Sequence, residues 1–449
     1  METTDTEKEA FYPIFNVYSR VGHVCASVQN NVIVWGGYRN DPDIFAEKYL
    51  PSTKINVYHT DHRYWTAHET TGYIPPGTSG ACAVIIDHKL YVFAGHTRNG
   101  NTNCLYYLDL TTLCWTNLTP TLATDDENEE QGVHKGDINV NHKGDFNVDH
   151  KGDNNKKEEQ LWPSPRDKFT MWSYKHRLYC FGGFGPNFTC DNLGVHGQFV
   201  YGEEGNGLSH RGWNNQLLVY DTITNTWTNP ACKGTAPLPR AAHAAARSRG
   251  QVYIFGGRHR NRRMNDLHCL DLDSLTWSGE LFVDGACPCG RSWHTLTAAS
   301  DDVAFLYGGY SEEGVPLDDA WQLHYVSRQW TQVTVRERRP RLWHTCACTS
   351  DGDLLVFGGC ENDILNYEEW SIQPNDVLSL RIQPARLQRL CLETASIYKE
   401  VTSQSWEILP KHLCEWLVRR QTIEELRSGR EAEPNPVPHG AHGQTCAIS

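Results

Sequence analysis

Four arginines are concentrated in one short segment of an otherwise acidic chain. The 449 residues include 41 lysines and arginines against 54 aspartates and glutamates, which gives a formal net charge of −13. The segment FGGRHRNRRMNDL nevertheless carries Arg258, Arg260, Arg262 and Arg263 directly after a glycine pair. A planar guanidinium group can donate two parallel hydrogen bonds to a carboxylate. The cluster therefore favours an anion-binding site, and a solvated, charge-rich loop is the alternative that composition leaves open.

Two short aromatic motifs, RGW with Trp213 and RSWH with Ser292 and Trp293, lie on either side of this segment. The surrounding sequence repeats six times as an apolar run, two small residues, a loop, a strand and usually a tryptophan. The small pairs are at 36–37, 94–95, 182–183, 256–257, 308–309 and 358–359. The later pairs recur about every 50 residues, the period of a kelch propeller blade. The chain is therefore predicted to be all-β, a six-bladed kelch β-propeller followed by a short C-terminal helical segment.

We expect the propeller to span residues 18–383, with blades that start near residues 20, 78, 166, 240, 291 and 341. Each blade should be a four-stranded antiparallel sheet, and the closing tryptophans should pack between neighbouring sheets. The sixth blade lacks such a tryptophan, and its last strand should begin at Val377. The acidic, asparagine-rich stretch at about 122–160 has almost no large apolar residues, which predicts a disordered insertion. A second long loop is expected at about 184–212.

Helical periodicity replaces the repeat in residues 384–426. LQRLCLETASIY has residues at three-and-four spacing, which predicts one helical face: Leu387, Leu390, Cys391, Thr394 and Tyr398. ILPKHLCEWLVRR contains a proline that a first helical turn accepts, Pro410. Its predicted apolar face consists of Leu409, Leu413, Trp416 and Leu417. Residues 427–449 are rich in proline and glycine and are expected to be a disordered tail.

Composition excludes several classes of function. An acidic chain without a basic stripe argues against nucleic-acid binding, and no apolar stretch approaches the ~20 residues that a membrane helix needs. The N-terminus lacks an apolar signal segment, so we expect a cytoplasmic or nuclear protein, or both. The cysteine pairs Cys287/Cys289 and Cys346/Cys348 are CxC and lack zinc-ligand spacing. We therefore expect no metal site and no cofactor.

The last four residues, CAIS, match the pattern for prenylation of Cys446. No polybasic segment or second lipid signal lies directly upstream, so a single prenyl group would anchor the protein weakly to membranes. Modification and coincidence both remain open at this point.

Five strings carry a resemblance to a known family: GGRHRNRRMNDLHCLDL, RSWHTLT, PRLWHT, PRAAHA and RGWNN. They are similar to the family of kelch domain-containing proteins 1 and 2, and the similarity covers about residues 18–420 apart from the insertion. Members of that family are substrate receptors of cullin-2 RING ubiquitin ligases, and they read the extreme C-terminus of proteins with a preference for terminal Gly-Gly. The resemblance implies that this chain is a non-catalytic adaptor that positions degradation substrates for ubiquitination.

The resemblance also assigns roles to the polar residues. Arg258 and Arg263 match the two arginines that hold the terminal carboxylate, and Ser292 matches the hydroxyl that completes this clamp. Charge-assisted hydrogen bonds to such a carboxylate contribute ~1.5–3 kcal/mol each. An amide or an internal peptide bond would leave these groups unpaired, so the clamp would distinguish a chain end from internal sequence.

The aromatic residues of the family site match in the same way. Trp213 and Trp293 correspond to walls around the last substrate residues, and Lys168 corresponds to a lysine near the rim. Phe184 departs from the pattern, because the family has a tyrosine there. The phenylalanine ring can pack but loses the phenolic hydrogen bond, which puts affinity, or substrate preference upstream of the terminal residues, in doubt.

The helical segment resembles the docking boxes of the same family. Leu387 and Cys391 match an elongin C box in which Leu387 is the inserted anchor, and Leu409, Pro410 and Leu413 match the adjoining cullin-2 box. The expected partners are therefore elongin B/C, cullin-2 and the C-terminal peptides of substrates. A helical pair that only packs on the propeller is the alternative.

Two other functions are compatible with a propeller. A kelch scaffold that binds partners without any role in ubiquitination is the main alternative. An enzymatic, metal-dependent propeller is disfavoured, because four histidines occupy equivalent blade positions and so indicate repeated structure rather than a ligand cluster: His23, His243, His294 and His344.

Overall fold

The computed structural model describes residues 13–41, 46–120, 162–187, 196–204, 207–366, 368–382 and 384–430. The predicted insertion at 122–160 lies outside the described residues. So does the tail from 431 onward, including Cys446.

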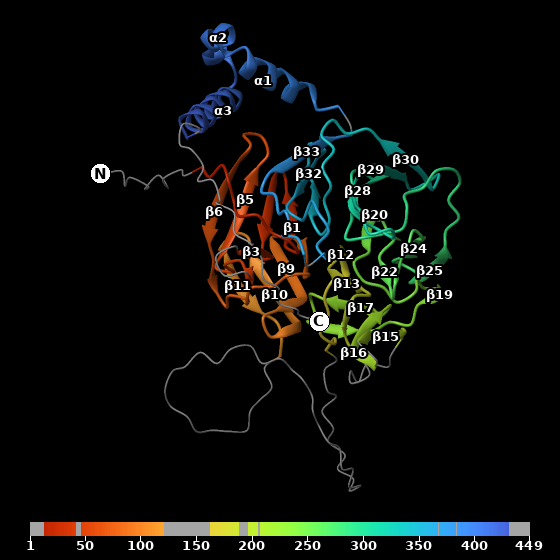
Figure 1. Cartoon of the computed structure of the whole chain (residues 1–449). Coiled ribbons are helices and arrows are strands. Elements are labelled where there is room, and N and C mark those ends of the chain that lie inside the picture. The colour runs from red at the N-terminus through yellow and green to blue at the C-terminus, as the bar shows by residue number, and fades with distance from the viewer. Residues whose placement is uncertain are drawn as a thin grey trace, which may run out of the picture.

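Six antiparallel sheets follow one another along the chain and surround a common axis (Figure 1). Blade one contains β1 (Val24–Val28), β2 (Asn31–Trp35), β5 (Lys54–His59) and β6 (Tyr64–Glu69), with the hairpin β3 (Tyr38–Asp41) and β4 (Ala46–Tyr49) after its glycine pair. Blade two contains β8 (Cys82–Ile86), β9 (Lys89–Thr97), β10 (Gly100–Asp109) and β11 (Cys114–Asn117). Blade three contains β12 (Thr170–Tyr174), β13 (Arg177–Phe181), β17 (Leu217–Asp221) and β18 (Thr226–Thr228).

Blade four contains β20 (Ala244–Ser248), β21 (Gln251–Phe255), β24 (Leu267–Asp271) and β25 (Thr276–Glu280). Blade five contains β27 (Thr295–Ala298), β28 (Val303–Ser311), β29 (Pro316–His324) and β30 (Gln329–Val333), and the short β26 (Arg291–Ser292) extends it. Blade six contains β31 (Thr345–Cys348), β32 (Asp353–Phe357) and β33 (Val377–Arg381). The chain is thus a six-bladed kelch β-propeller with a C-terminal helical segment, as predicted.

Three details differ from the prediction. Blade six has three strands in the described residues, with β33 last and starting at Val377 as expected. Blades two and four each gain a fifth, parallel strand, β7 (Thr71–Gly72) and β19 (Lys233–Thr235). The described parts of the expected loop at 184–212 form a small sheet of β14 (Phe184–Pro186), β16 (Gly207–Asn214) and β15 (Phe199–Glu204).

The arginine that starts a blade is a buried structural residue. Arg240 donates to the carbonyl oxygen of Gly256 at 2.8 Å and to both carboxylate oxygens of Asp266 at 2.7 and 2.6 Å. Gly256 has φ +65°, and a Cβ there would lie 2.8 Å from the carbonyl oxygen of Arg291 in the next blade. At this crowded turn the glycine carbonyl needs a hydrogen-bond donor, which the arginine supplies, and there is no room for a side chain. The repeat therefore combines an arginine with a glycine.

The closing tryptophans pack between sheets, as predicted. In each case the indole contacts an aromatic residue of the preceding blade, at ring distances of 4.8–5.2 Å: Trp65 on Phe357, Trp115 on Trp35, Trp227 on Phe93, Trp277 on Phe181 and Trp330 on Phe255. Aromatic pairs of this kind stabilise the contact beyond the area that they bury. Neighbouring blades, the last and the first included, are thus joined by the same side-chain contact at five seams.

A closed ring of backbone hydrogen bonds encircles the axis. It contains one residue from each blade, all with φ between 53° and 64°: Gly22, Gly80, Lys168, Ala242, Trp293 and Trp343. Each of them donates its N–H to the carbonyl of its counterpart in the preceding blade. We call this set the rim ring. The inner strands next to it surround an axial cavity of about 220 Å³ lined by the four repeated histidines, among other residues.

The C-terminal segment forms α1 (Leu387–Ile397), α2 (Lys399–Thr402), the 3₁₀ helix η2 (Ser403–Ile408) and α3 (Lys411–Arg430). Figure 1 shows these helices in blue outside the ring, near β5, β6 and β33. Pro410 directly precedes α3, and its carbonyl accepts hydrogen bonds from the N–H groups of Leu413 and Cys414. The helix therefore starts directly after the predicted proline, and it runs to Arg430, beyond the predicted end. No helix of the described residues is long and apolar enough to cross a membrane.

Candidate functional site

The residue after each glycine pair occupies an equivalent place in every blade. Five of these residues form backbone bridges to the residue that follows the blade-start position, and Tyr310 pairs with Ser292 in the same way. The set consists of Tyr38, His96, Phe184, Arg258, Tyr310 and Cys360. In each blade the rim-ring residue directly follows the bridged residue in the sequence. Polar and aromatic side chains from several blades are therefore brought to one end of the axis.

Arg258 and Arg263 lie directly opposite each other in a two-stranded ribbon, β22 (Arg258–His259) and β23 (Arg262–Arg263). Like charges at directly opposed positions destabilise an antiparallel pair by ~0.2–1 kcal/mol. Among the described residues, no ion pair joins either guanidinium to a carboxylate. A ribbon that keeps two opposed cations without an ion pair to a carboxylate is unfavourable for folding and suits the binding of an external anion.

Ser292 contacts this pair. Its hydroxyl accepts a hydrogen bond from Nε of Arg263 at 3.1 Å, and the serine is buried. The Arg263 guanidinium also lies 4.4 Å from the ring centre of Tyr310. Burial, and then the charge of Arg258, lower the pKa of Arg263 from its usual value, although Tyr310, Glu312 and Asp363 act in the opposite direction. The nearby positive charge makes an incoming carboxylate more favourable at this position.

Trp293 lies beside the clamp in the rim ring. Its indole stacks on Trp343 at 5.7 Å and contacts Tyr310 at 6.1 Å. The ammonium group of Lys168 lies 5.1 Å from the Trp343 ring and pairs with the Asp167 carboxylate at 2.6 Å. The large side chains of the ring are thus those of Lys168 in blade three, Trp293 in blade five and Trp343 in blade six, whereas the other three positions are glycine or alanine.

Phe184 and Trp213 form a second aromatic group. They are directly opposed in the β14–β16 pair, and their rings meet edge-to-face at 5.1 Å. The guanidinium of Arg211 lies 4.9 Å from the Phe184 ring. Phe184 is also bridged through its backbone to Asp167, the neighbour of Lys168. The structure therefore connects all seven predicted site residues of the propeller through contacts around one rim.

Sequence reasoning missed four residues of this rim. Tyr310 and Trp343 contact Arg263 and Trp293, Arg211 contacts Phe184, and Glu312 accepts a hydrogen bond from the backbone N–H of Arg263. Tyr310 could have been found from the repeat alone, because it follows a glycine pair as Arg258 and Phe184 do. Trp343 could also have been found, because it is aligned with Trp293 in PRLWH.

The predicted face of α1 is exposed. Leu387 is 76% exposed and Leu390 41%, and Cys391, Thr394 and Tyr398 are exposed as well. The helix contacts the propeller through other residues. An apolar helical face that stays open to solvent is available for a partner.

The predicted face of α3 is divided. Leu417 is fully buried, and Trp416 contacts the ring of His62 in blade one at 5.1 Å. Leu409 and Leu413 are half-buried, and Pro410 is exposed. The inner part of α3 therefore packs on the propeller, whereas α1 presents its predicted face outward.

The repeated histidines form no metal centre. His243, His344 and His23 are buried and contact the threonine hydroxyls of the preceding blades at 2.7–3.0 Å. In the part of the chain that the structure describes, no group of three or more potential ligands is arranged to hold a metal ion.

Several known proteins are similar to this chain in sequence. The family model of the KLHDC2/KLHL20/DRC7 Kelch-repeats domain matches residues 22–137, 132–303 and 193–387. Human kelch domain-containing protein 2 is 38% identical over 398 residues, which cover 88% of each chain. Human kelch domain-containing protein 1 is 36% identical over 420 residues, which cover 92% of this chain and 93% of the relative. The bovine kelch domain-containing protein 2 is 37% identical over 398 residues and covers 88% of both chains.

A solved structure shows the same fold at much lower sequence identity. The structure of YjhT superposes with a TM-score of 0.53 at 14% identity, and the match covers 82% of this chain and 96% of that one. This likeness supports the architecture alone.

Proposed function

This chain belongs to the KLHDC2/KLHL20/DRC7 kelch-repeat family, and on that premise we propose that it binds the free C-termini of partner proteins as the substrate-recognition subunit of a cullin-2/elongin B/C ubiquitin ligase. Arg258, Arg263 and Ser292 hold the terminal carboxylate, and a small terminal residue such as glycine fits between the aromatic side chains. The subunit is a non-catalytic adaptor. It contributes proximity between the bound substrate and the ubiquitin-transferring machinery.

One observation carries the proposal: two arginines are directly opposed in a ribbon without a carboxylate partner among the described residues, and one of them donates to a buried serine. Two guanidiniums and a hydroxyl match the oxygens of a chain end better than those of an internal peptide group, which bears no charge. Charge-assisted hydrogen bonds of this kind are about twice as strong as neutral ones.

A paired set of peptides tests this proposal. Fluorescence polarisation should detect binding of a peptide that ends in Gly-Gly with a free carboxylate, and its C-terminal amide should bind at least ~10-fold more weakly, because the charged bonds contribute ~1.5–3 kcal/mol each. Equal affinity for the acid and the amide would reject the carboxylate clamp. A matched peptide with a bulky terminal residue should also bind weakly if the aromatic side chains limit the available space.

The exposed face of α1 supports the second half of the proposal. Leu387 and Cys391 lie on this open face and would contact elongin C, while Leu409, Pro410 and Leu413, between η2 and α3, would contact cullin-2. A kelch scaffold without a role in ubiquitination would share the propeller site but would have no reason to keep the α1 face apolar and exposed. Co-purification with elongin B/C separates these two functions.

A further inference from the structure

One seam of the propeller differs from the others because the chain does not connect its two blades. Blade one is built from residues at the N-terminal end of the propeller and blade six from residues at the C-terminal end of the propeller. Within the described residues no strand is shared between their sheets. The other five seams join blades that are consecutive in sequence. Separation at the first–last seam is thus opposed only by non-covalent contacts, and no connecting segment limits it.

The longest backbone hydrogen bond of the rim ring crosses this seam. The N–H of Gly22 lies 3.3 Å from the carbonyl oxygen of Trp343, whereas the other five bonds of the ring measure 2.7–3.0 Å. Two further backbone bonds cross the seam, from Ser350 to Gln29 and from Gly359 to Arg20. Side-chain hydrogen bonds cross it as well, from Asn30 of blade one to the Asp351 carboxylate at 2.8 Å and from Asn40 to the hydroxyl of Ser371 at 2.6 Å. These bonds and the apolar contacts between the sheets hold the blades together without a covalent link.

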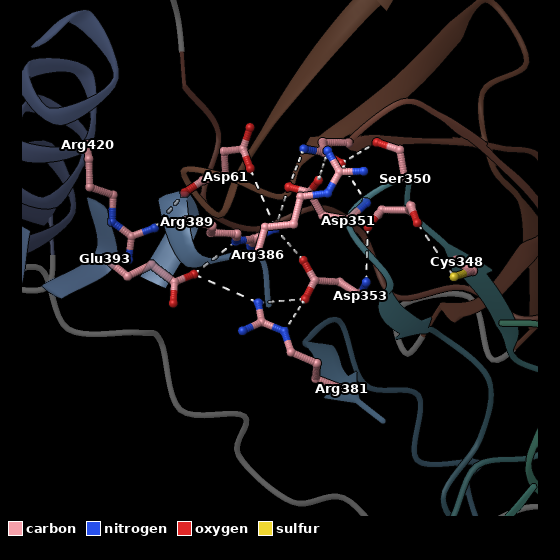
Figure 2. Close-up of polar contacts among 12 residues, drawn as sticks. Asp61, Cys348, Ser350, Asp351, Asp353, Arg381, Arg386, Arg389, Glu393 and Arg420 are labelled. Atoms are coloured by element: carbon pink, nitrogen blue, oxygen red, sulfur yellow. Dashed lines mark hydrogen bonds and ion pairs between the residues drawn. The ribbon is translucent and has the colours of Figure 1, made fainter. Parts of the chain in front are cut away.

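Arg389 of α1 lies across this seam at the edge of the propeller, as Figure 2 shows. Its side chain is 9% exposed, and its guanidinium lies 2.6 Å from the Asp353 carboxylate and 3.3 Å from the Asp351 carboxylate, both of blade six. The same guanidinium lies 3.7 Å from the carboxylate of Asp61 in blade one. One cation is therefore shared by carboxylates from the first and last blades.

Further contacts hold the arginine and its acids in place. Glu393, one turn along α1, accepts from Nε of Arg389 at 3.0 Å, and Arg381 donates to Asp353 at 2.8 Å. Although burial disfavours the charged guanidinium, Asp353, Glu393 and Asp61 raise the pKa of Arg389 above its usual value. The arginine is therefore a fully charged member of a partly buried network rather than a solvated surface residue.

The other helix contacts blade one. Nη1 of Arg420 donates to the backbone carbonyl of Asp61 at 2.9 Å, and Nη2 of Arg419 donates to the hydroxyl of Tyr64 at 2.8 Å. Trp416 packs against His62 in the same turn. Since α1 contacts blade six and α3 contacts blade one, the helical pair spans the seam from outside.

We propose that the C-terminal helical segment closes the propeller ring, with Arg389 as the central bridge between the carboxylates of the first and last blades. This role is separate from the proposed recognition of C-termini and holds whether or not a ubiquitin ligase is assembled. Removing one partner of a buried ion pair leaves the other charges uncompensated. Asp353 would keep its contact with Arg381, but Asp61 and Asp351 would lose the cation that they share, so loss of Arg389 should drive these two carboxylates apart and open the seam that they line.

Hydrogen exchange of the full-length protein tests the bridge, with Arg389→Met as the variant. The amides of Gly22, Ser350 and Gly359, which bond across the first–last seam, should exchange about tenfold or more faster. The amides of Ala242 and Trp293, which make the same ring bonds between chain-connected blades, should not change. Arg386→Met is the matched control, because Arg386 is 77% exposed and lies 3.9 Å from Asp351, and it should leave all five amides unchanged.

A second variant tests the same proposal if Arg389→Met does not fold. Asp61→Asn removes the only blade-one carboxylate of the described network and keeps the contacts of Arg389 with blade six. It should produce a smaller, seam-specific increase in exchange at the same three amides. Faster exchange confined to residues 384–430, with the seam amides unchanged in the soluble variant, would overturn the proposal, because the helices would then be an appendage rather than a closure.

Discussion

At the scale of single residues, the opposed arginines of the clamp favour peptide binding and disfavour folding of the propeller. Arg258→Met and Arg263→Met should each weaken binding of a peptide ending in Gly-Gly by about 10- to 100-fold, since each removes charge-assisted bonds of ~1.5–3 kcal/mol. The melting temperature of Arg258→Met should stay equal or rise, because the opposed like charge is relieved. Polarisation titrations and thermal unfolding measure the two effects.

Arg262→Met is the matched control for these variants. Arg262 lies on the same ribbon but pairs with His259 and is exposed, so its loss removes one positive charge without touching the clamp. A comparable loss of affinity in this control would indicate that general positive charge, rather than the opposed pair, attracts the peptide.

The individual site residues could be predicted from sequence because they occupy repeated positions. Arg258 follows a glycine pair and Trp293 follows a blade-start arginine by two residues, so the repeat places both at one rim. The contact of Arg211 with Phe184 could not be predicted in this way. It depends on the small β14–β16–β15 sheet, whose segment the sequence indicated only as a long loop.

At the scale of elements, the two helices show what amphipathicity can and cannot predict. The periodicity of 387–398 and 409–417 correctly predicted apolar faces, but it could not tell which face would be covered. An apolar stripe is equally compatible with intramolecular packing and with a partner groove. The folded structure shows which face is covered: Trp416 and Leu417 are turned toward the protein interior, whereas Leu387 is exposed to solvent.

This difference leads to a prediction for α1. Leu387→Asp should abolish co-purification of elongin B/C while changing the melting temperature very little, because a side chain that is 76% exposed contributes little to folding. Val326→Asp is the control, since Val326 is also an exposed apolar residue, at 90%, but lies on the propeller. Retention of elongin B/C by Leu387→Asp would favour the scaffold function.

At the scale of the whole molecule, the propeller is held by contacts that repeat from blade to blade, and its irregularities are informative. Blade number and the outer tryptophan contacts follow from the sequence repeat, because each blade must bury its sheet against the next. The contact that closes the ring does not follow from the sequence repeat. The first and last blades are far apart in the sequence and come together only in the folded protein. The acidic residues that line their seam, Asp61 and Asp353, carry no periodic signal.

A second irregularity lies in the histidine contacts around the axial cavity. The histidine of one blade contacts a threonine hydroxyl of the preceding blade at three seams, such as His243 with Thr170 at 2.9 Å. At the seam of blades four and five the threonine position is Ala244, and Nε2 of the buried His294 has no hydrogen-bond partner in the described structure. A buried polar atom without a partner costs ~1–3 kcal/mol.

Restoring the missing contact should therefore stabilise the whole ring. Ala244→Thr places a hydroxyl where the other seams have one, and the adjoining cavity of about 220 Å³ leaves room for it. We expect the free energy of unfolding to rise by ~1 kcal/mol, the usual net contribution of one hydrogen bond, as measured by urea denaturation. Ala244→Val adds the same volume without the hydroxyl, so equal stabilisation by valine would attribute the gain to packing and leave His294 unsatisfied.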